Sequence, residues 1–388
     1  MSSATVLSRR FVWALVCLLL CVVVALMFGG VPETARAQIP EWSAHVVDSE
    51  GARTIYFVDA NEGWAGDLDG YLFHTTDGGV TWAKSRLPQS KTSSFRFGTA
   101  RQIQFIDKTN GWVLSAGDYK AKDGYWYNAS RLYRTTDGGA TWTKLWTRRA
   151  SVAEFQFVSP TRGWFVLGRT VYRSTNGGVT LKNQHADKAI LAPKKLAWLQ
   201  GLRFVDANNG WACGGYIGGW TKPILLRTRN GGKTWKRAKF GLVGGVNDVW
   251  FVNRSVGYAI AKGLYKTTNA GKSWHRIKYA KSQGYDLIQG FGTTGVRLVG
   301  GKPRVTDGPS NVTTVVWTSR DGGATWTSVD LDTAYTGGTV ADASAMWFID
   351  IDTGWIAGGR RDTPESGSQY CILRTPGIEE AVVAPPLE

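Results

Sequence analysis

The sequence predicts an all-β protein, a seven-bladed β-propeller of four-stranded antiparallel blades that is closed by its N-terminal strand. Three observations predict this fold. The composition is unusual, because the 388 residues include 48 glycines and 19 tryptophans but only 20% charged residues, which is unlike a chain of solvated helices. The chain also repeats itself, and each repeat contains four short runs of strand character.

The repeat consists of seven units between Ile55 and Thr375. Each unit opens with an apolar run that leads into a Gly-Trp step and closes with a glycine-rich turn, although the sixth unit is degenerate at its start and the seventh lacks the closing turn. Within the first unit, turn residues separate four runs, which are 55–59, 64–67, 71–75 and 82–87. Four-stranded units repeated about an axis form a propeller, in which only short sheet edges remain.

The closure of the ring can be predicted from the two ends of the repeat region. No fourth strand follows Thr375 in the seventh unit, whereas residues 41–47 precede the first unit and are similar to the outer strand of the other units. We therefore expect residues 42–47 to complete the seventh blade. The same assignment places Cys213 in blade four and Cys371 in blade seven, nearly opposite each other, which is too far apart for a disulfide.

The closing turn of each unit follows the pattern Ser/Thr-x-Asp/Asn-x-Gly-x-Ser/Thr-Trp, with Leu181 in place of tryptophan in the third unit. An Asp or Asn side chain in this position accepts hydrogen bonds from the following backbone amides. We therefore interpret these residues as structural rather than as a binding site. They are Asp77, Asp137, Asn176, Asn230, Asn269 and Asp321.

These turns resemble the Asp-box (BNR) repeat of sialidases, sortilin-type receptors and some glucanases. The Gly-Trp step combined with Leu-Tyr-Arg-Thr-Thr-Asp-Gly-Gly-x-Thr-Trp is more similar to the photosystem II assembly and stability factors of chloroplasts and cyanobacteria and their relatives in non-photosynthetic bacteria. The resemblance covers about residues 41–378. It implies an exported seven-bladed propeller that binds membrane-protein assembly intermediates and has no known catalytic activity.

Three parts are expected along the chain. Residues 1–37 contain Arg9 and Arg10, an apolar run over residues 11–28 and the small-residue site Ala35-Arg36-Ala37, which is the pattern of an export signal. A retained N-terminal anchor is the alternative, since 18 apolar residues are near the minimum for crossing a bilayer. Both interpretations place the propeller, residues 38–378, outside the cytoplasm. Residues 379–388 form an acidic, proline-rich tail, which we expect to be disordered.

Catalysis is not expected. A sialidase requires an arginine cluster, a tyrosine nucleophile with its glutamate and an acid/base aspartate, and the Phe/Tyr-Arg-Ile-Pro signature expected near the first strand is absent. The carboxylates of Asp67, Asp69 and Glu154 have no pairing that their spacing establishes. The four histidines fall in different units, which argues against a metal site, and no motif indicates a cofactor.

A binding site is expected on the propeller face that carries the longer connections. If the four strands of a blade alternate in direction, the connections between second and third strands share one face with the links between blades. We interpret residues 115–130, 214–223, 301–314 and 358–369 as long irregular loops on that face, and binding residues concentrate on such loops. Their aromatic and basic residues are of the types enriched in interface hot spots. The candidate partner-binding residues are Tyr125, Trp126, Arg148, Arg149, Lys194, Lys195, Trp198, Trp220, Lys222, Lys302, Arg304, Arg360 and Arg361.

The formal net charge of +16 suits an acidic protein partner or an anionic membrane surface, whereas nucleic acid is not expected outside the cytoplasm. We therefore expect a non-catalytic exported scaffold that binds a protein. The resemblance implies an integral membrane protein or an assembly intermediate as that partner. The alternative is a glycan-binding or sialidase-like cell-surface protein, with Trp126 and Trp220 as platforms for sugar rings.

Overall fold

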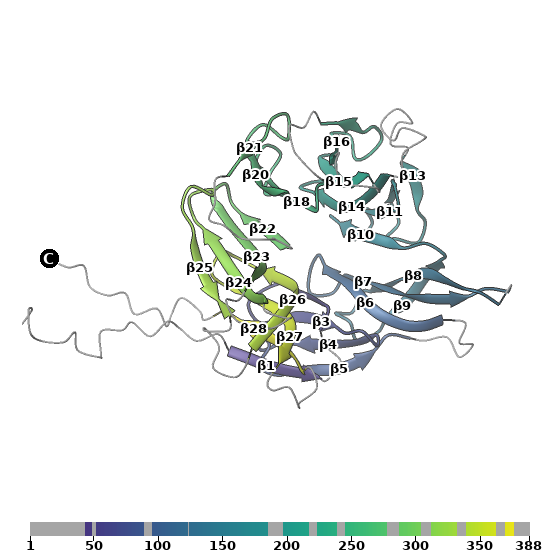
Figure 1. The fold of residues 1–388 in the computed structure, drawn as a ribbon. Helices are drawn as coiled ribbons and strands as arrows, with labels where there is room; N and C mark the ends of the chain where they lie inside the picture. The colour runs from purple at the N-terminus through teal and green to yellow at the C-terminus, as the bar shows by residue number, and fades with distance from the viewer. Residues whose placement is uncertain are drawn as a thin grey trace, which may run out of the picture. The chain divides into compact units, whose positions relative to one another are not determined.

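Seven four-stranded antiparallel sheets form a ring, as Figure 1 shows. The structure is a computed structural model, and it describes residues 43–48, 52–88, 95–122, 124–184, 197–216, 223–238, 245–277, 287–303, 312–331, 339–361 and 369–375. All of these lie in one compact unit, residues 41–380. The first strands of neighbouring blades contact each other all around the ring, so they line a central channel. The fold is therefore the predicted all-β propeller.

Blades one to four are built from consecutive strands. Blade one consists of β2 (Thr54–Phe57), β3 (Gly63–Gly66), β4 (Tyr71–Thr75) and β5 (Ala83–Arg86). Blade two consists of β6 (Phe95–Phe105), β7 (Gly111–Lys120), β8 (Trp126–Thr135) and β9 (Thr143–Arg148). Blade three consists of β10 (Val152–Phe157), β11 (Gly163–Leu167), β12 (Thr170–Ser174) and β13 (Lys182–Gln184). Blade four consists of β14 (Ala197–Phe204), β15 (Gly210–Tyr216), β16 (Pro223–Thr228) and β17 (Lys236–Arg237).

The remaining blades complete the ring. Blade five consists of β18 (Asp248–Phe251), β19 (Gly257–Ala261), β20 (Gly263–Thr267) and β21 (His275–Arg276). Blade six consists of β22 (Leu287–Phe291), β23 (Gly295–Pro303), β24 (Val312–Ser319) and β25 (Thr327–Asp330). Blade seven consists of β26 (Thr339–Phe348), β27 (Gly354–Arg361), β28 (Gln369–Arg374) and, from the start of the chain, β1 (Ser43–Asp48).

The predicted closure is confirmed. The strand β1 pairs antiparallel with β28, so that Ser43 lies opposite Arg374 and His45 opposite Ile372. The predicted strand began one residue earlier, at Trp42, which lies outside the described residues. A side chain also joins the two ends of the repeat, because the indole Nε1 of Trp347 in blade seven donates to the carbonyl of Phe57 in blade one at 2.8 Å.

The Gly-Trp steps hold neighbouring blades together. The ring of Trp64 in blade one stacks on Phe105 in blade two, with centroids 3.5 Å apart. Its Nε1 donates to the carbonyl of Gly138 in the closing turn of blade two at 3.1 Å. The same pairing of a tryptophan with the phenylalanine and the turn of the next blade recurs at Trp112, Trp164, Trp211 and Trp355. These five fully or almost fully buried tryptophans therefore form the contacts between blades.

Each Gly-Trp step requires glycine because a phenylalanine ring on the neighbouring strand leaves no space for a side chain. In blade one, the ring of Phe57 lies over Gly63 on the neighbouring strand, and an added Cβ atom would lie 2.4 Å from the ring. Any larger residue would push away the phenylalanine on which the tryptophan of the preceding blade stacks.

The six closing turns share one hydrogen-bond pattern. In blade one, the Thr75 hydroxyl donates to Asp77 Oδ1 at 2.8 Å, and Asp77 accepts from the backbone N–H of Thr81 at 2.9 Å. The corresponding residues Asp137, Asn176, Asn230, Asn269 and Asp321 make the same contacts. Hydrogen bonds from Thr135 and Thr141 lower the pKa of the Asp137 carboxyl to about 2. Each of the six side chains thus bonds within its own turn.

The two ends of the blades differ. The connection between first and second strands and the closing turn are adjacent in each of the six blades that have this turn. In blade one, the Gly78 N–H donates to the Asn61 carbonyl at 2.7 Å. We call this side the turn face. The opposite side carries the connections between second and third strands and the links between blades, and we call it the loop face. The two cysteines of the described ranges, Cys213 in β15 and Cys371 in β28, are buried and are not joined by a disulfide.

Candidate functional site

An extension of blade two projects on the loop face (Figure 1). The sequence interpretation of residues 115–130 as an irregular loop is wrong, because β7 and β8 each continue for ten residues and pair as far as Lys120 and Trp126. The inner strand β6 follows them as far as the pairing of Phe95 with Tyr119. The side chains of residues 115–120 and 126–130 point alternately to the two faces of the sheet, so the sheet rather than a loop holds them.

Large apolar side chains are exposed at this end of the molecule. Tyr125 is 71% exposed, Trp126 37% and Tyr127 43%, all at or next to the tip of the β7–β8 hairpin. Trp198, at the start of blade four, is 38% exposed. The described part of the chain exposes only two other large apolar side chains, both valines in closing turns on the turn face. The loop face of blades two to four is therefore where exposed aromatic surface gathers.

A hollow of about 510 Å³ lies beside this hairpin, at the link between blades two and three. Its lining includes Arg148, Arg149, Tyr172 and Trp198. The Arg149 guanidinium carbon lies 4.6 Å from the ring centroid of Tyr119 and 5.9 Å from that of Tyr127. The guanidinium of Arg148 lies 5.6 Å from the Trp146 ring and 5.9 Å from the Tyr172 ring. Cation–π contacts of this kind orient arginines without neutralising them.

The link that carries these arginines is fixed by one buried hydroxyl. Ser130 Oγ donates to the Ala150 carbonyl at 2.9 Å and accepts from the Val152 N–H at 3.0 Å. The backbone of the link is therefore held to β8, and the arginines are presented by a rigid element. We call the set Tyr119, Tyr125, Trp126, Tyr127, Arg148, Arg149, Tyr172 and Trp198 the aromatic–arginine face.

Of the thirteen predicted partner-binding residues, Arg148, Arg149 and Trp198 line one hollow, and Tyr125 and Trp126 lie at the tip of the adjoining hairpin. Lys302 lies in β23, and Arg360 and Arg361 lie in β27, in each case at the loop-face end of the strand. Lys194, Lys195, Trp220, Lys222 and Arg304 lie outside the described residues. Tyr172 is part of the hollow but was not predicted, because it occupies a repeat position of the third strand and has the pattern of scaffold.

The central channel holds a second polar site that the sequence did not reveal. The channel contains two cavities, one toward the loop face and one toward the turn face. Four residues line both cavities and therefore separate one from the other: Tyr56, Arg203, Trp250 and Trp347. The Tyr56 and Trp347 rings are 4.0 Å apart, and the Arg203 guanidinium lies 3.5 Å from the Trp250 centroid.

Two carboxyl groups interact with Arg203 in the channel wall. Glu154 accepts a hydrogen bond from the Leu202 N–H at 2.5 Å, and Asp248 accepts one from the Val249 N–H at 2.7 Å. Burial raises the pKa of Glu154 well above its usual range, and Asp248 adds to this effect. Burial also raises the pKa of Asp248 to about 7, and the charge of Arg203 opposes that rise. Glu154, Gly201 and Asp248 stand at the same position of successive inner strands, which is the repeat signal that could have indicated this pair.

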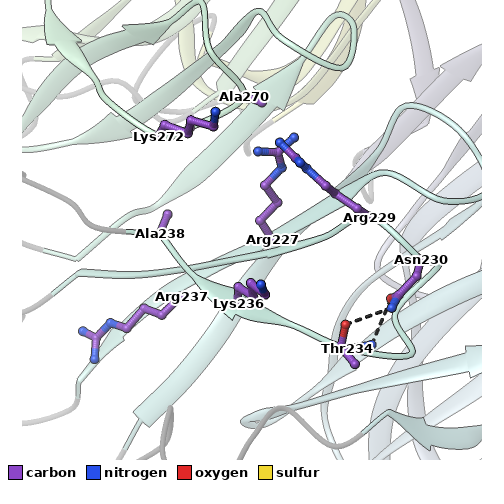
Figure 2. A pocket seen from close by; sticks show the side chains of 10 residues that line it. Arg227, Arg229, Asn230, Thr234, Lys236, Arg237, Ala238, Ala270 and Lys272 are labelled. Atoms are coloured by element: carbon purple, nitrogen blue, oxygen red, sulfur yellow. Dashed lines mark hydrogen bonds between the residues drawn. The ribbon is translucent and has the colours of Figure 1, made fainter.

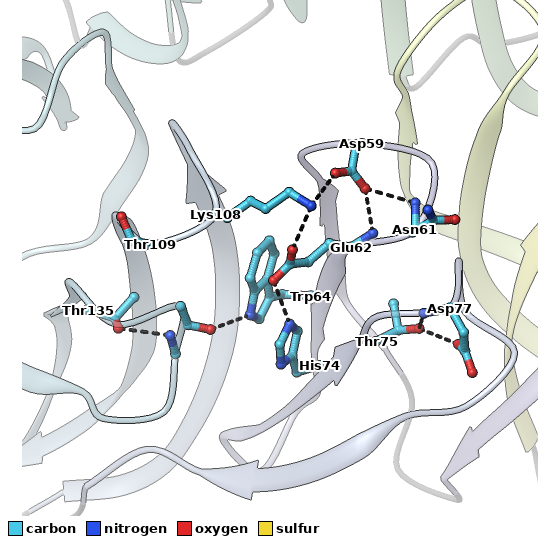
Figure 3. Close-up of polar contacts among 12 residues, drawn as sticks. Asp59, Asn61, Glu62, Trp64, His74, Thr75, Asp77, Lys108, Thr109 and Thr135 are labelled. Carbon is cyan, nitrogen blue, oxygen red and sulfur yellow. Dashed lines mark hydrogen bonds and ion pairs between the residues drawn. The ribbon is translucent and has the colours of Figure 1, made fainter.

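The other polar groups of interest stabilise connections between strands. Lys108 in blade two bonds the carboxylates of Asp59 at 2.7 Å and Glu62 at 3.2 Å in blade one, and His74 bonds Glu62 at 3.3 Å (Figure 3). The first of these contacts lowers the pKa of Asp59. Asp67 accepts hydrogen bonds from the N–H groups of Asp69 and Tyr71 in its own hairpin. No group of three metal-ligating side chains occurs among the described residues.

The fold defines a protein class, the seven-bladed β-propellers, and several solved structures are similar to this chain. Neither the protein-family models nor the curated proteins contain a match. YCF48 bound to a D1 peptide is 17% identical with a TM-score of 0.61, over 86% of this chain and 96% of that one. YCF48 from Cyanidioschyzon merolae is 17% identical with a TM-score of 0.60, over 87% and 99%. The C-terminal WD40 domain of Sif2 is 10% identical with a TM-score of 0.52, over 87% and 99%. At these identities the likeness is one of fold.

No helix in the described ranges has both the length and the apolar character needed to cross a membrane.

Proposed function

We propose that this chain is a non-catalytic binding scaffold that docks on a protein partner through the aromatic–arginine face. The observation that carries the proposal is the exposure of Tyr127 and Trp198 next to Arg148 and Arg149, on a hairpin whose tip also exposes Tyr125 and Trp126. Aromatic and arginine side chains dominate the binding energy of protein interfaces. Because they are already oriented in the free protein, little conformational entropy is lost when a partner binds.

The chemistry of the face indicates the kind of partner. Arg148 and Arg149 have no ion-pair partner among the carboxylates of the described residues, so both charges are available to acidic groups of another protein. The partner is therefore an acidic segment that also carries apolar or aromatic side chains. YCF48, which has the same fold, is a protein with a structure bound to a D1 peptide, and this supports a peptide segment as the partner.

The finer assignment follows the resemblance to photosystem II assembly factors and their bacterial relatives. We propose an exported protein, outside the cytoplasm, that binds a membrane-protein assembly intermediate, with residues 11–28 as part of an export signal or anchor. The Asp-box identity of the closing turns belongs to the same proposal. It is supported by their shared hydrogen-bond pattern.

Site-specific photo-crosslinking tests the docking surface. The full chain is produced in its host with a photoreactive phenylalanine at Tyr125, and after irradiation the crosslinked proteins are identified by mass spectrometry. A matched control carries the photoreactive residue at Thr76, which is exposed on the turn face. We expect one partner that is crosslinked from position 125 and not from position 76, and that is lost in Arg149→Glu. Equal crosslinking from both positions would contradict this docking surface.

Glycan binding is the outcome that would replace the proposal. Trp126 is exposed at the tip of the hairpin and is of the residue type that stacks on sugar rings. Binding on a glycan array that is lost in Trp126→Ala, together with no protein crosslink from position 125, would favour a glycan-binding protein.

A further inference from the structure

A basic pocket of about 550 Å³ lies between the outer parts of blades four and five, on the turn-face side (Figure 2). Five basic residues line it and no acidic residue does: Arg227, Arg229, Lys236, Arg237 and Lys272. The rest of the lining is small or neutral, and includes Ala238 and Ala270. The volume is in the range of small-molecule sites and is larger than a bare inorganic ion requires.

The pocket exists because one side chain is short. The N–H of Ala238 donates to the Leu225 carbonyl, and in the next blade the N–H of Ile277 donates to the Leu264 carbonyl, so the two residues are structurally equivalent. Ile277 fills the space against the closing turn of blade six, where a Cβ atom added to Gly323 would lie 2.6 Å from its Cδ1. The three atoms nearest to a Cβ atom added to the equivalent Gly271 lie 3.5–3.6 Å away, and none of them belongs to Ala238. The space that Ile277 fills is thus left open beside Ala238.

Among the described residues, Arg229 in this pocket also lacks the acidic partner that its equivalent in blade six has. Arg229 corresponds to Arg320 in the closing turn of blade six, and Arg320 forms an ion pair with Asp352 of the next blade. Ser255 takes the place of Asp352 next to blade four. The backbone N–H of Ser255 donates to Asn253 Oδ1, just as the backbone N–H of Asp352 donates to Asp350 Oδ1. No carboxylate within the described ranges forms an ion pair with Arg229.

Arg227 supplies a half-buried donor beside this arginine. Its Nε is buried and finds no hydrogen-bond partner among the described residues, and its guanidinium lies 5.7 Å from the Trp211 ring. Figure 2 shows the guanidinium groups of Arg227 and Arg229 approaching each other in the pocket. Burial, and then the charge of Arg229, lower the pKa of Arg227. Two like charges that converge around an unsatisfied donor are stabilised by an anion.

We propose that this pocket binds the phosphate or sulfate ester group of a small organic ligand. The two guanidiniums match a tetrahedral oxyanion, because each can donate two parallel hydrogen bonds. The ammonium groups of Lys236 and Lys272 balance the rest of its charge. The space beside Ala238 and Ala270 receives the organic body. This site is on the opposite face from the aromatic–arginine face and does not depend on the proposed partner.

Calorimetric titration of the full chain at physiological salt tests the proposal, with glucose 6-phosphate, glucose 6-sulfate, inorganic phosphate, succinate and glucose as probes. At least one of the two esters should bind with a dissociation constant below about 1 mM, more tightly than inorganic phosphate. Which ester binds more tightly distinguishes the two sources of the oxyanion. Glucose should not bind. Succinate binding as tight as that of the esters would overturn the proposal, because it would show a general attraction for negative charge.

Three variants assign the binding to the pocket. Arg229→Gln should weaken ester binding at least about tenfold, the loss expected for a charged hydrogen bond. Arg276→Gln, which removes the same charge from an exposed position of blade five outside the pocket, should leave it unchanged. Ala238→Ile keeps all five charges and fills the hollow as Ile277 does, and it should also abolish binding. Ester binding that survives Ala238→Ile, or that falls equally in Arg276→Gln, would overturn the assignment.

Discussion

The indole Nε1 of Trp355 in blade seven donates a 2.8 Å hydrogen bond to the carbonyl of Gly78 in blade one, 277 residues away in the chain. The same ring stacks on Phe57 with centroids 3.4 Å apart. This residue and Trp347 therefore join the last blade to the first with side chains, in addition to the strand pairing of β1 with β28.

Trp355→Phe should lower the free energy of unfolding by about 1–3 kcal/mol, because it keeps an aromatic ring but leaves the buried Gly78 carbonyl without its donor. Chemical denaturation of the full chain measures the change. Trp82→Phe is the matched control, since Trp82 bonds Gly79 within its own turn and does not join two blades. A loss of stability in Trp82→Phe as large as in Trp355→Phe would contradict a special role for the contact between blades.

Gly163→Ala should destabilise the protein by about 1–3 kcal/mol, which is typical of overpacking a buried site. The added Cβ atom would lie 2.6 Å from the Phe157 ring, which stacks on Trp112 of the preceding blade. Thermal denaturation compares this variant with wild type. Unchanged stability would show that the phenylalanine can move without loss, contrary to the role inferred for the glycine.

The stability of the protein should fall as the pH rises from about 4 to 7. In this range the unfolded chain releases the proton of Asp248, whose usual pKa is 3.8, whereas the folded chain keeps it because burial raises the pKa to about 7. Asp248→Asn should make this decline smaller and be the more stable form at pH 8, while the share of Glu154, whose pKa burial also raises, should remain. Asp137→Asn is the control and should leave the decline in place, because the pKa of Asp137 is lowered rather than raised. The turn should tolerate this substitution, since Asn230 accepts the same backbone hydrogen bond in the equivalent turn of blade four. Denaturation curves across the pH range measure both; a decline that persists unchanged in Asp248→Asn would contradict this assignment.

The two thiols of the propeller should be unreactive in the folded protein. Cys213 and Cys371 are both fully buried, and burial raises the pKa of the Cys213 thiol well above its usual range, so little thiolate forms. In a full chain with Cys17→Ser and Cys21→Ser, a colorimetric thiol reagent should detect two thiols only after denaturation. Detection of none after denaturation without reductant would indicate a disulfide.

The repeat allowed the fold to be predicted because each blade reuses the same contacts. Two departures could not be interpreted from the pattern. Blade three has Leu181 in place of the turn tryptophan, and Trp146 of blade two replaces it by donating to the Gly178 carbonyl at 2.8 Å. Blade six has Arg297 in place of the step tryptophan, and its guanidinium stacks on Phe348 at 4.4 Å. In both cases a residue outside the repeat pattern makes the contact that the tryptophan makes in other blades. The packing is therefore kept although the sequence pattern is lost.

The candidate site was predictable only in part. The alternating direction of the strands was enough to assign one group of residues to the same face, because this assignment needs only the order of the strands in the chain. The group is Tyr125, Trp126, Arg148, Arg149 and Trp198. The extension of β7 and β8 was not foreseen, since glycine and polar residues in 115–130 have the pattern of a loop. The cluster of Arg203 with Glu154 and Asp248 depends on three blades meeting at the channel, and the pocket beside Ala238 depends on a side chain being small. The pocket leaves no local signal in the sequence, and the carboxylate pair can be recognised only by comparing the inner strands of successive blades.

The central claim is that a protein partner binds the aromatic–arginine face. Its most direct test is the affinity of the identified partner, or of its acidic segment, for the full chain and for Arg149→Glu, measured by surface plasmon resonance at two salt concentrations. We predict at least about tenfold weaker binding to the variant and a smaller salt dependence, while Arg254→Glu on the turn face leaves the affinity within about twofold. Equal affinity for wild type and Arg149→Glu would contradict the claim.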